Sequence, residues 1–178
     1  FIPIIIAIGG IALTLFIVFT PYRLQRILSY NDPDTDVRGT RYHLNQALIT
    51  IGSGGMTGVG YGQSTLKISS LPEPMGDSIF AVIAEEFGFI GAMFFISLYL
   101  VLVFAGFMGS LSTRTDFGKL ILVGFSSIIG FQAFIHIASI SGLIPMTGIP
   151  LPFISYGGTA LVTFMAMAGF MVNTLRNG

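Results

Sequence analysis

The sequence predicts an all-α integral membrane protein with four transmembrane helices and a long extracytoplasmic loop. Its mean hydropathy of +0.85, with 53% apolar and 9% charged residues, lies outside the range of ordinary soluble domains. Several apolar runs are long enough to cross about 30 Å of hydrocarbon as helices that rise 1.5 Å per residue. Polar or proline-rich segments separate these runs, which indicates several crossings by one chain.

Composition also excludes several classes of function. The net charge is zero and no run of Lys or Arg occurs, so neither nucleic-acid binding nor a polybasic membrane-surface role is indicated. The absence of cysteine excludes disulfides, thiolate catalysis and cysteine-ligated metals. The charge-free run that starts at Phe1 has no basic segment and no small-residue cleavage site, so it is not a signal peptide. We expect the chain to begin inside the membrane domain of a longer protein.

The first predicted span ends at Pro21, which is followed by the basic residues Arg23 and Arg26. The second starts near Asp77 and is longer than a bilayer requires. The segment from Leu120 to Leu175 has no charged residue and is too long for one crossing, so the proline cluster within it must divide it in two. The four predicted spans are about 1–20, 78–108, 120–140 and 154–175, all within a single domain, 1–178.

The polar segment 21–77 is predicted to be one large loop with a functional role. It holds five of the eight Lys and Arg residues, and six glycines lie between Gly52 and Gly62. Within it, Tyr42 to Ile51 has the apolar spacing of a short interfacial helix. The short loop near Arg114 and Lys119 marks the cytoplasmic side, so the large loop is expected outside, where its cations need an anionic ligand.

Three other patterns resemble binding motifs but do not match them. The glycine-rich stretch lacks both dinucleotide and Walker spacing, so a tight chain reversal under steric pressure is favoured. Asp32, Asp34 and Asp36 alternate as in a calcium loop, but Val37 stands where that loop needs glycine. The two histidines are far apart and have no second ligand nearby, which argues against zinc. The sequence leaves open whether a divalent cation assists.

Asp77 is the leading candidate for a functional carboxylate. It lies where polar sequence meets a membrane-length apolar run, and charges beside hydrocarbon are costly and therefore often functional. An aspartate at a helix start can instead be an N-cap, and the sequence supports cap and catalytic base equally. Glu73 is held between Pro72 and Pro74 in a stiff extended turn, although simple solvation is the competing explanation.

The residues that follow Asp77 predict close helix packing. On a regular helix, Ala81, Ala84, Gly88 and Gly91 lie within about 40° of Asp77, a small-residue face that another helix can approach. Glu85 and Glu86 would lie about 80° and 180° away, so a regular helix cannot present both to the same cavity.

The run PLPFISYGGTA, from Pro150 to Ala160, is the last candidate site. We expect its prolines to precede a helix whose first turn contains Ser155, Tyr156, Gly157, Gly158 and Thr159. Free amides at such a helix start can bind an anion, particularly at membrane depth. A well-capped membrane helix without a ligand is the alternative.

These residues resemble the SEDS family (shape, elongation, division and sporulation), the FtsW/RodA group of peptidoglycan glycosyltransferases. The similar runs follow the family order over nearly the whole chain and look closer to the FtsW branch. The resemblance implies the C-terminal part of a ten-span, GT-C-like fold in the bacterial plasma (inner) membrane at the division septum. The runs are PYRLQRI, YHLNQALITIGSGGMTGVGYGQSTLK, LPEPMGDSIFAVIAEEFGFIG and QAFIHIASISGLIPMTGIPLPFISYGGTA.

By this resemblance the chain extends glycan strands from lipid II, and undecaprenyl pyrophosphate is the leaving group. Asp77 takes the position of the family's catalytic carboxylate, and we expect it to act as general base. The resemblance also implies a class B penicillin-binding protein as partner, with other divisome proteins. The residues expected to bind substrate, from this resemblance and from charge, are Lys67, Glu73, Arg23, Arg26, Gln46, Ser155, Tyr156, Gly157 and Gly158.

Three positions depart from the family pattern. Met75 and Gly76 replace the pair His-Thr of many members, which alters the surroundings of Asp77. Thr147 stands where some members have lysine, so any phosphate contact of that lysine is absent. His136 replaces a common asparagine, which we interpret as a tolerated polar exchange. A transporter (flippase) that moves the lipid-linked precursor without forming bonds is the rival function, since it too needs a basic cavity and broken helices.

Overall fold

The computed structural model describes residues 40–64 and 76–177. The chain divides into two compact units, Phe1–His43 and Leu44–Gly178. The described part of the first unit is short, Thr40 to His43, and forms the first turn of a helix that continues into the second unit. The architecture below is that of the second unit, apart from this first turn.

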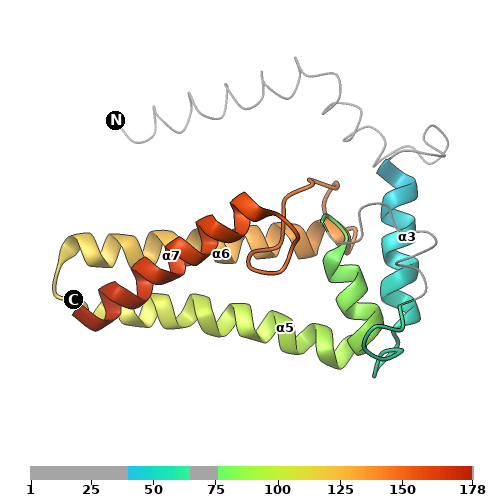
Figure 1. Cartoon of the computed structure of the whole chain (residues 1–178), viewed down its shortest axis with the longest axis horizontal. Helices are drawn as coiled ribbons and strands as arrows, with labels where there is room; N and C mark the ends of the chain where they lie inside the picture. The colour runs from blue at the N-terminus through green and yellow to red at the C-terminus, as the bar shows by residue number, and fades with distance from the viewer. Residues whose placement is uncertain (1–39, 65–75, 178) are drawn as a thin grey trace, which may run out of the picture. The chain divides into compact units, whose positions relative to one another are not determined.

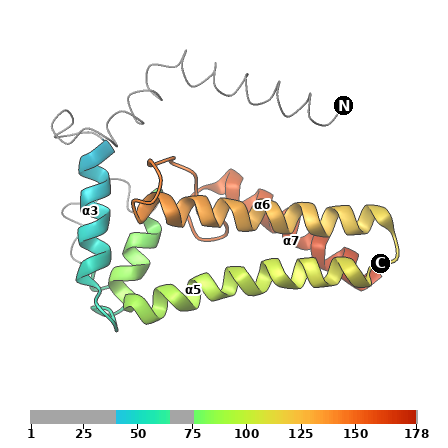
Figure 2. The same ribbon diagram turned by 180° about the vertical axis from the view of Figure 1, so that it is seen from behind.

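All regular structure in the described residues is helical, and the helices are α3 (Thr40–Ser53), α5 (Ile79–Ser112), α6 (Asp116–Ile140) and α7 (Gly158–Asn177). Helix α5 runs along the molecule, α6 returns beside it, and α7 runs back across the pair (Figures 1 and 2). Three segments, Ile79–Ser112, Asp116–Ile140 and Gly158–Arg176, are long and apolar enough to cross a membrane. The predicted span 1–20 lies outside the described residues.

The helix predicted from Tyr42 to Ile51 is confirmed as α3, which continues through Ser53. Helix α6 starts at Asp116, four residues before the predicted third span, because Thr115 caps it by accepting a hydrogen bond from the amide of Gly118. Helix α7 starts only at Gly158, so the prediction that Ser155, Tyr156 and Gly157 belong to its first turn is wrong. The amides of Ile154 and Ser155 instead donate to the carbonyl of Leu151, which makes this segment a separate turn.

Helix α5 is broken at Gly88, whose φ of 68° and ψ of −169° are not helical. The break leaves backbone groups without helical partners, and residues 54–64, here called the glycine loop, supply them. The amides of Val59 and Gly60 donate to the carbonyls of Glu85 and Glu86, each over 3.0 Å. In return, the amides of Phe89 and Ile90 donate to the carbonyls of Gly55 and Met56, over 2.9 and 3.2 Å. Irregular backbone is tolerated at membrane depth only when it is satisfied in this way.

The glycines of this loop are required by the close approach of the two backbones. A Cβ on Gly54 would collide with the carbonyl of Ala84, and one on Gly58 would collide with that of Glu86. A Cβ on Gly88 would in turn strike the amide nitrogen of Gly58. The predicted steric pressure on the glycine stretch is therefore confirmed, and a helix backbone exerts it.

The segment of α5 before the break is enclosed by protein on all sides. Every residue from Phe80 to Glu86 is buried, whereas the helix after Gly88 exposes most of its large side chains. This difference explains the excess length of the predicted second span. The 34-residue helix is a buried half-helix followed by a longer segment that can cross the bilayer unaided.

The predicted close packing is confirmed for Ala81 and Ala84, since both belong to a buried cluster with Ala47 of α3 and Ala133 of α6. It is wrong for Gly91, which lies beyond the break and next to Phe87 of the same helix. Glu85 and Glu86 are both buried although they point in different directions, because the half-helix is surrounded. The Ser64 hydroxyl donates a hydrogen bond to Oε2 of Glu85 and so attaches the end of the glycine loop to the half-helix.

The part of α5 that follows the break packs against α6 and α7. Gly106 has no side chain, and this leaves room for Ser126 of α6 and Met171 of α7.

Residues 141–157, here called the strap, connect α6 to α7 and fold back along α6. A polar stripe on α6, at spacings of four and three residues, holds this irregular segment. The side chain of Gln132 donates to the carbonyl of Pro150 over 3.1 Å, and His136 contacts the carbonyl of Ile149 over 2.6 Å. The Ser139 hydroxyl accepts a hydrogen bond from the amide of Thr147 over 3.0 Å. The strap is thus fixed against the same end of the helices at which α5 begins (Figures 1 and 2).

Candidate active site

Asp77 lies in a turn immediately before α5, and its side chain is half-buried. The N-cap of α5 is Ser78, not Asp77, and the side chain of Ser78 forms no capping hydrogen bond. The structural alternative in which Asp77 caps this helix is therefore wrong. Within the described residues its carboxylate has neither a hydrogen-bond partner nor an ion-pair partner.

The carboxylate of Asp77 rests against the strap at Gly148. A Cβ on Gly148 would come within 3.1 Å of Oδ2 of Asp77, so a side chain there would displace the carboxylate by a few tenths of an ångström. Gly148 also has a φ of 67°, in the left-handed region that favours glycine. Glycine at this position therefore allows both the close approach of the carboxylate and the left-handed backbone conformation.

Ser155 joins the end of the strap to the turn that carries Asp77. Its hydroxyl accepts a hydrogen bond from the amide of Leu151 over 2.7 Å and donates one to the carbonyl of Gly76 over 3.0 Å. The side chain is buried, and both bonds are made within the protein. Gly76 directly precedes Asp77, so Ser155 holds the backbone from which the carboxylate projects.

Tyr99 of α5 adds a further anchor, since its hydroxyl donates to the carbonyl of Pro152 in the strap. The next residue, Phe153, has a φ of 65°, a conformation that costs a non-glycine residue about 1–3 kcal/mol. Its ring packs on Phe164 of α7 with the ring centroids 5.7 Å apart. The strap is thus held in a strained conformation beside the candidate carboxylate.

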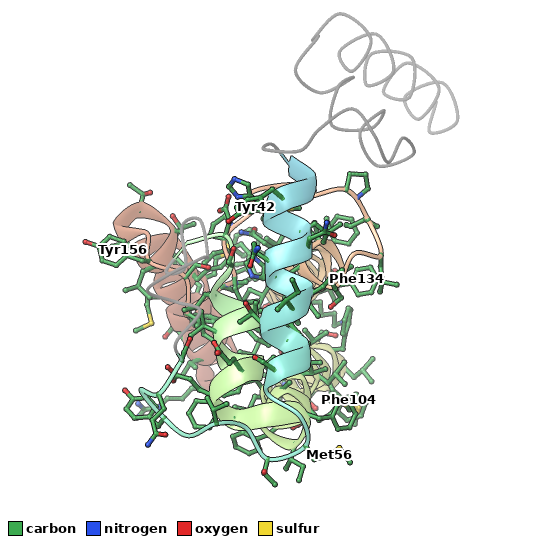
Figure 3. All side chains as sticks on the ribbon, turned by 90° about the vertical axis from the view of Figure 1, so that its right-hand side faces the viewer. Tyr42, Met56, Phe104, Phe134 and Tyr156 are labelled. Atoms are coloured by element: carbon green, nitrogen blue, oxygen red, sulfur yellow. The ribbon has the colours of Figure 1, made fainter. Side chains whose placement is uncertain are left out.

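The other predicted site residues in the described part of the chain are less enclosed. Tyr156 is 87% exposed and points away from the helices (Figure 3). Gly157 accepts a hydrogen bond from the amide of Leu161, and Gly158 begins α7, where the first amides have no intrahelical acceptor. Gln46 lies on α3 with a half-buried side chain. Four predicted residues lie outside the described residues: Arg23, Arg26, Lys67 and Glu73.

Sequence reasoning missed the anchors of the strap. Gln132, His136 and Ser139 recur at helical spacing in the second half of α6, which is otherwise apolar from Ile128 onward, and this pattern was the available signal. No group of three or more His, Cys, Asp or Glu that could hold a metal ion occurs in the described ranges.

Within the described residues, three helices long and apolar enough to span a membrane, one of them broken at Gly88, place the chain in the class of polytopic membrane proteins with discontinuous helices. The sequence profile of the FtsW/RodA/SpoVE family, described as "Cell cycle protein", matches residues 1–178. The chain belongs to this family, and its predicted membership and helical membrane fold are confirmed.

Curated relatives from several branches match at similar levels. Stage V sporulation protein E of Bacillus subtilis is 41% identical over 90% of this chain and 44% of the relative. Peptidoglycan glycosyltransferase MrdB of Escherichia coli is 37% identical over 92% of this chain and 47% of the relative. The probable peptidoglycan glycosyltransferase FtsW of Geobacter sp. (strain M18) is 35% identical over 95% of this chain and 46% of the relative. These values do not separate the division branch from the others.

Solved structures share the fold. A chain from a structure described as "Structural coordination of polymerization and crosslinking by a peptidoglycan synthase complex" matches with a TM-score of 0.68 and 27% identity, over 96% of this chain and 48% of that chain. A variant of the Thermus thermophilus rod shape determining protein RodA matches with a TM-score of 0.57 and 32% identity, over 74% of this chain and 39% of that chain. The present chain spans about half the length of the curated relatives that it matches.

Proposed function

We propose that the chain is part of a peptidoglycan glycosyltransferase that polymerises lipid II, with Asp77 as general base. The single observation that carries this proposal is the position of the Asp77 carboxylate. It is half-buried at the junction of the strap and the α5 half-helix and has no partner among the described side chains. Relatives named peptidoglycan glycosyltransferase, at 35–37% identity, support the reaction class.

In the proposed reaction, Asp77 takes the proton of the acceptor's 4-hydroxyl while that oxygen attacks the anomeric carbon of the donor. The bond from the anomeric carbon to the pyrophosphate oxygen breaks, and undecaprenyl pyrophosphate leaves with the electron pair. The leaving group needs no proton, only positive charge and amides to receive it, so a second carboxylic acid is unnecessary. We assign this task to Lys67, Arg23, Arg26 and the amides at Gly157 and Gly158.

Two predicted substrate contacts are reassigned within this proposal. The hydroxyl of Ser155 already makes two internal hydrogen bonds, so we propose that it positions the Asp77 turn. The exposed Tyr156 ring remains available to contact substrate. The proposal retains Glu73 and Gln46 as polar contacts to the sugar.

The test is lipid II polymerisation by the full-length protein with Asp77→Asn, which removes the base but keeps the shape of the side chain. General-base catalysis contributes roughly 10² to 10⁴ in rate, so we expect polymer to fall by that factor. Binding of lipid II and the thermal unfolding temperature should stay unchanged. Polymer at the normal rate would refute the assignment of Asp77.

A translocation assay on the same variant addresses the flippase alternative. The enzyme hypothesis expects the Asp77→Asn protein to lose glycan strands while movement of lipid II across vesicles is unaffected. Loss of translocation with normal polymerisation would instead favour transport.

We further propose that the full-length protein acts with a class B penicillin-binding protein in the bacterial inner membrane at the division septum. The similar fold of a chain from a structure described as a peptidoglycan synthase complex supports a transpeptidase partner. Polymerisation measured with and without that partner tests the assembly, and a rate that does not depend on the partner would contradict it.

A further inference from the structure

His136 is a buried polar residue that the proposed reaction does not use. It lies on α6 and is 2% exposed. Its Nδ1 is 2.6 Å from the carbonyl oxygen of Ile149. A carbonyl can only accept, so Nδ1 carries the proton and donates it, and Nε2 of the neutral ring is left as an acceptor. Nε2 is buried and has no hydrogen-bond partner in the part of the chain that the structure describes.

An imidazole in this position lowers the stability of the fold. A buried acceptor without a donor costs about 1–3 kcal/mol, whereas an apolar side chain of similar shape would avoid that cost. An apolar residue could pack here but could not form the Nδ1–H bond. That bond fixes the carbonyl of Ile149, in the middle of the strap.

The fixed carbonyl is adjacent to the candidate base. Ile149 follows Gly148, against which Oδ2 of Asp77 rests. A shift of the strap at Ile149 would therefore move the surface that sets the direction of the carboxylate.

We propose that His136 is a positioning residue for Asp77, which acts by holding the Ile149 carbonyl through Nδ1–H. The inference rests on the proposed role of Asp77 as the base. It assigns His136 no contact with substrate and no proton transfer. Its effect is geometric, because a general base displaced by about 1 Å can lose roughly a hundredfold in rate.

The side chain of asparagine supplies the matched variant. The amide nitrogen of asparagine and Nδ1 of histidine are both two bonds from Cβ, so His136→Asn keeps the donor in place and removes the unpartnered Nε2. His136→Leu keeps an apolar volume but removes the donor. Phe134→Leu, at a 64% exposed position two residues away on α6, serves as the control for changes to this helix.

The experiment measures kcat and KM for lipid II polymerisation by the full-length protein, corrected for the folded fraction. We expect His136→Asn and Phe134→Leu to stay within about threefold of the wild-type kcat. His136→Leu should lose 10- to 100-fold in kcat with KM nearly unchanged, because a misdirected base impairs the chemical step more than binding. His136→Gln, whose donor is one bond further from the backbone, should also lower kcat and replaces the leucine variant if that protein does not fold.

The combination with Asp77→Asn separates positioning from general damage. If His136 acts through Asp77, adding His136→Leu to Asp77→Asn should lower the residual rate no further. Equal kcat values for wild type and His136→Leu, or equal losses in His136→Asn and His136→Leu, would overturn the inference. Normal polymerisation by Asp77→Asn alone would overturn the proposed function instead, so the two failures can be told apart.

Discussion

At the scale of single residues, the glycines at the contact between the glycine loop and α5 are positions where a methyl group would collide with main-chain atoms. Gly88 combines a left-handed φ with a backbone neighbour on the side where Cβ would lie. Gly58 meets the same helix from the loop side with a φ of 80°. Neither position can relax by turning a side chain, since the obstacles are main-chain atoms.

Gly88→Ala should therefore be strongly destabilising. The backbone conformation costs an L-residue about 1–3 kcal/mol, and displacement of the glycine loop adds the loss of its hydrogen bonds. Gly124→Ala on α6 is the control, because its Cβ would meet nothing within 4 Å. Thermal unfolding in detergent should show a large decrease for the first variant and little change for the second. Similar unfolding temperatures for the two would contradict the described break.

Residue types alone identified Asp77 as a candidate, but they could not distinguish a cap from a free carboxylate. The distinction depends on a shift of one residue, because Ser78 is the N-cap, and periodicity does not locate helix ends so finely. The importance of His136 was missed for a similar reason. Its partner, a carbonyl in the strap, cannot be identified from residue types, although the spacing of His136 with Gln132 and Ser139 was a signal of a polar stripe on the helix.

At the scale of elements, side chains from two helices hold the middle of the strap, whereas its first residues bond to backbone carbonyls at the end of α6. Tyr99 of α5 and the polar stripe of α6 donate hydrogen bonds to carbonyls of this irregular segment. The sequence predicted that prolines interrupt the apolar run between Leu120 and Leu175. It could not predict that the interrupted segment folds back along α6, because that arrangement depends on contacts between distant residues.

Tyr99→Phe tests this account of the strap. The change keeps the ring but leaves the carbonyl of Pro152 without its donor, which should cost about 1–3 kcal/mol. Hydrogen exchange of the strap amides should become faster while that of the α6 interior is unchanged. Ser97→Ala, which removes an exposed hydroxyl bonded to the carbonyl of Phe94 on the same helix, should leave both rates as they are.

At the scale of the whole molecule, the described helices expose many large apolar side chains. Phe104 of α5 and Phe134 of α6 lie on the outer side of their helices (Figure 3), and they are 65% and 64% exposed. Such a surface suits lipid or other membrane helices, and the relatives are about twice as long as this chain. Composition alone predicted a membrane environment for these helices, because a mean hydropathy this high is typical of chains surrounded by lipid.

A charge on that surface should be costly. Phe104→Lys places an ammonium group on the membrane-crossing part of α5, where insertion scales give a penalty of about 2.5–3.5 kcal/mol near the helix centre. The folded yield of the full-length protein in membranes should fall, whereas Phe104→Leu should behave as wild type. An undiminished yield for the lysine variant would indicate that this face lines a water-filled space.

The break at Gly88 also divides α5 into a part that crosses the membrane and a part that positions the candidate base. Residues after the break form the exposed, membrane-crossing part of the helix, whose tilt must adjust when the bilayer becomes thicker or thinner. Residues before it are held by the glycine loop, which also bonds to Phe89 and Ile90 after the break, and by Ser155 of the strap through Gly76. Protein contacts rather than lipid therefore set the position of the buried half-helix. We therefore expect the Asp77 carboxylate to keep the same direction relative to the strap in lipids of different chain length.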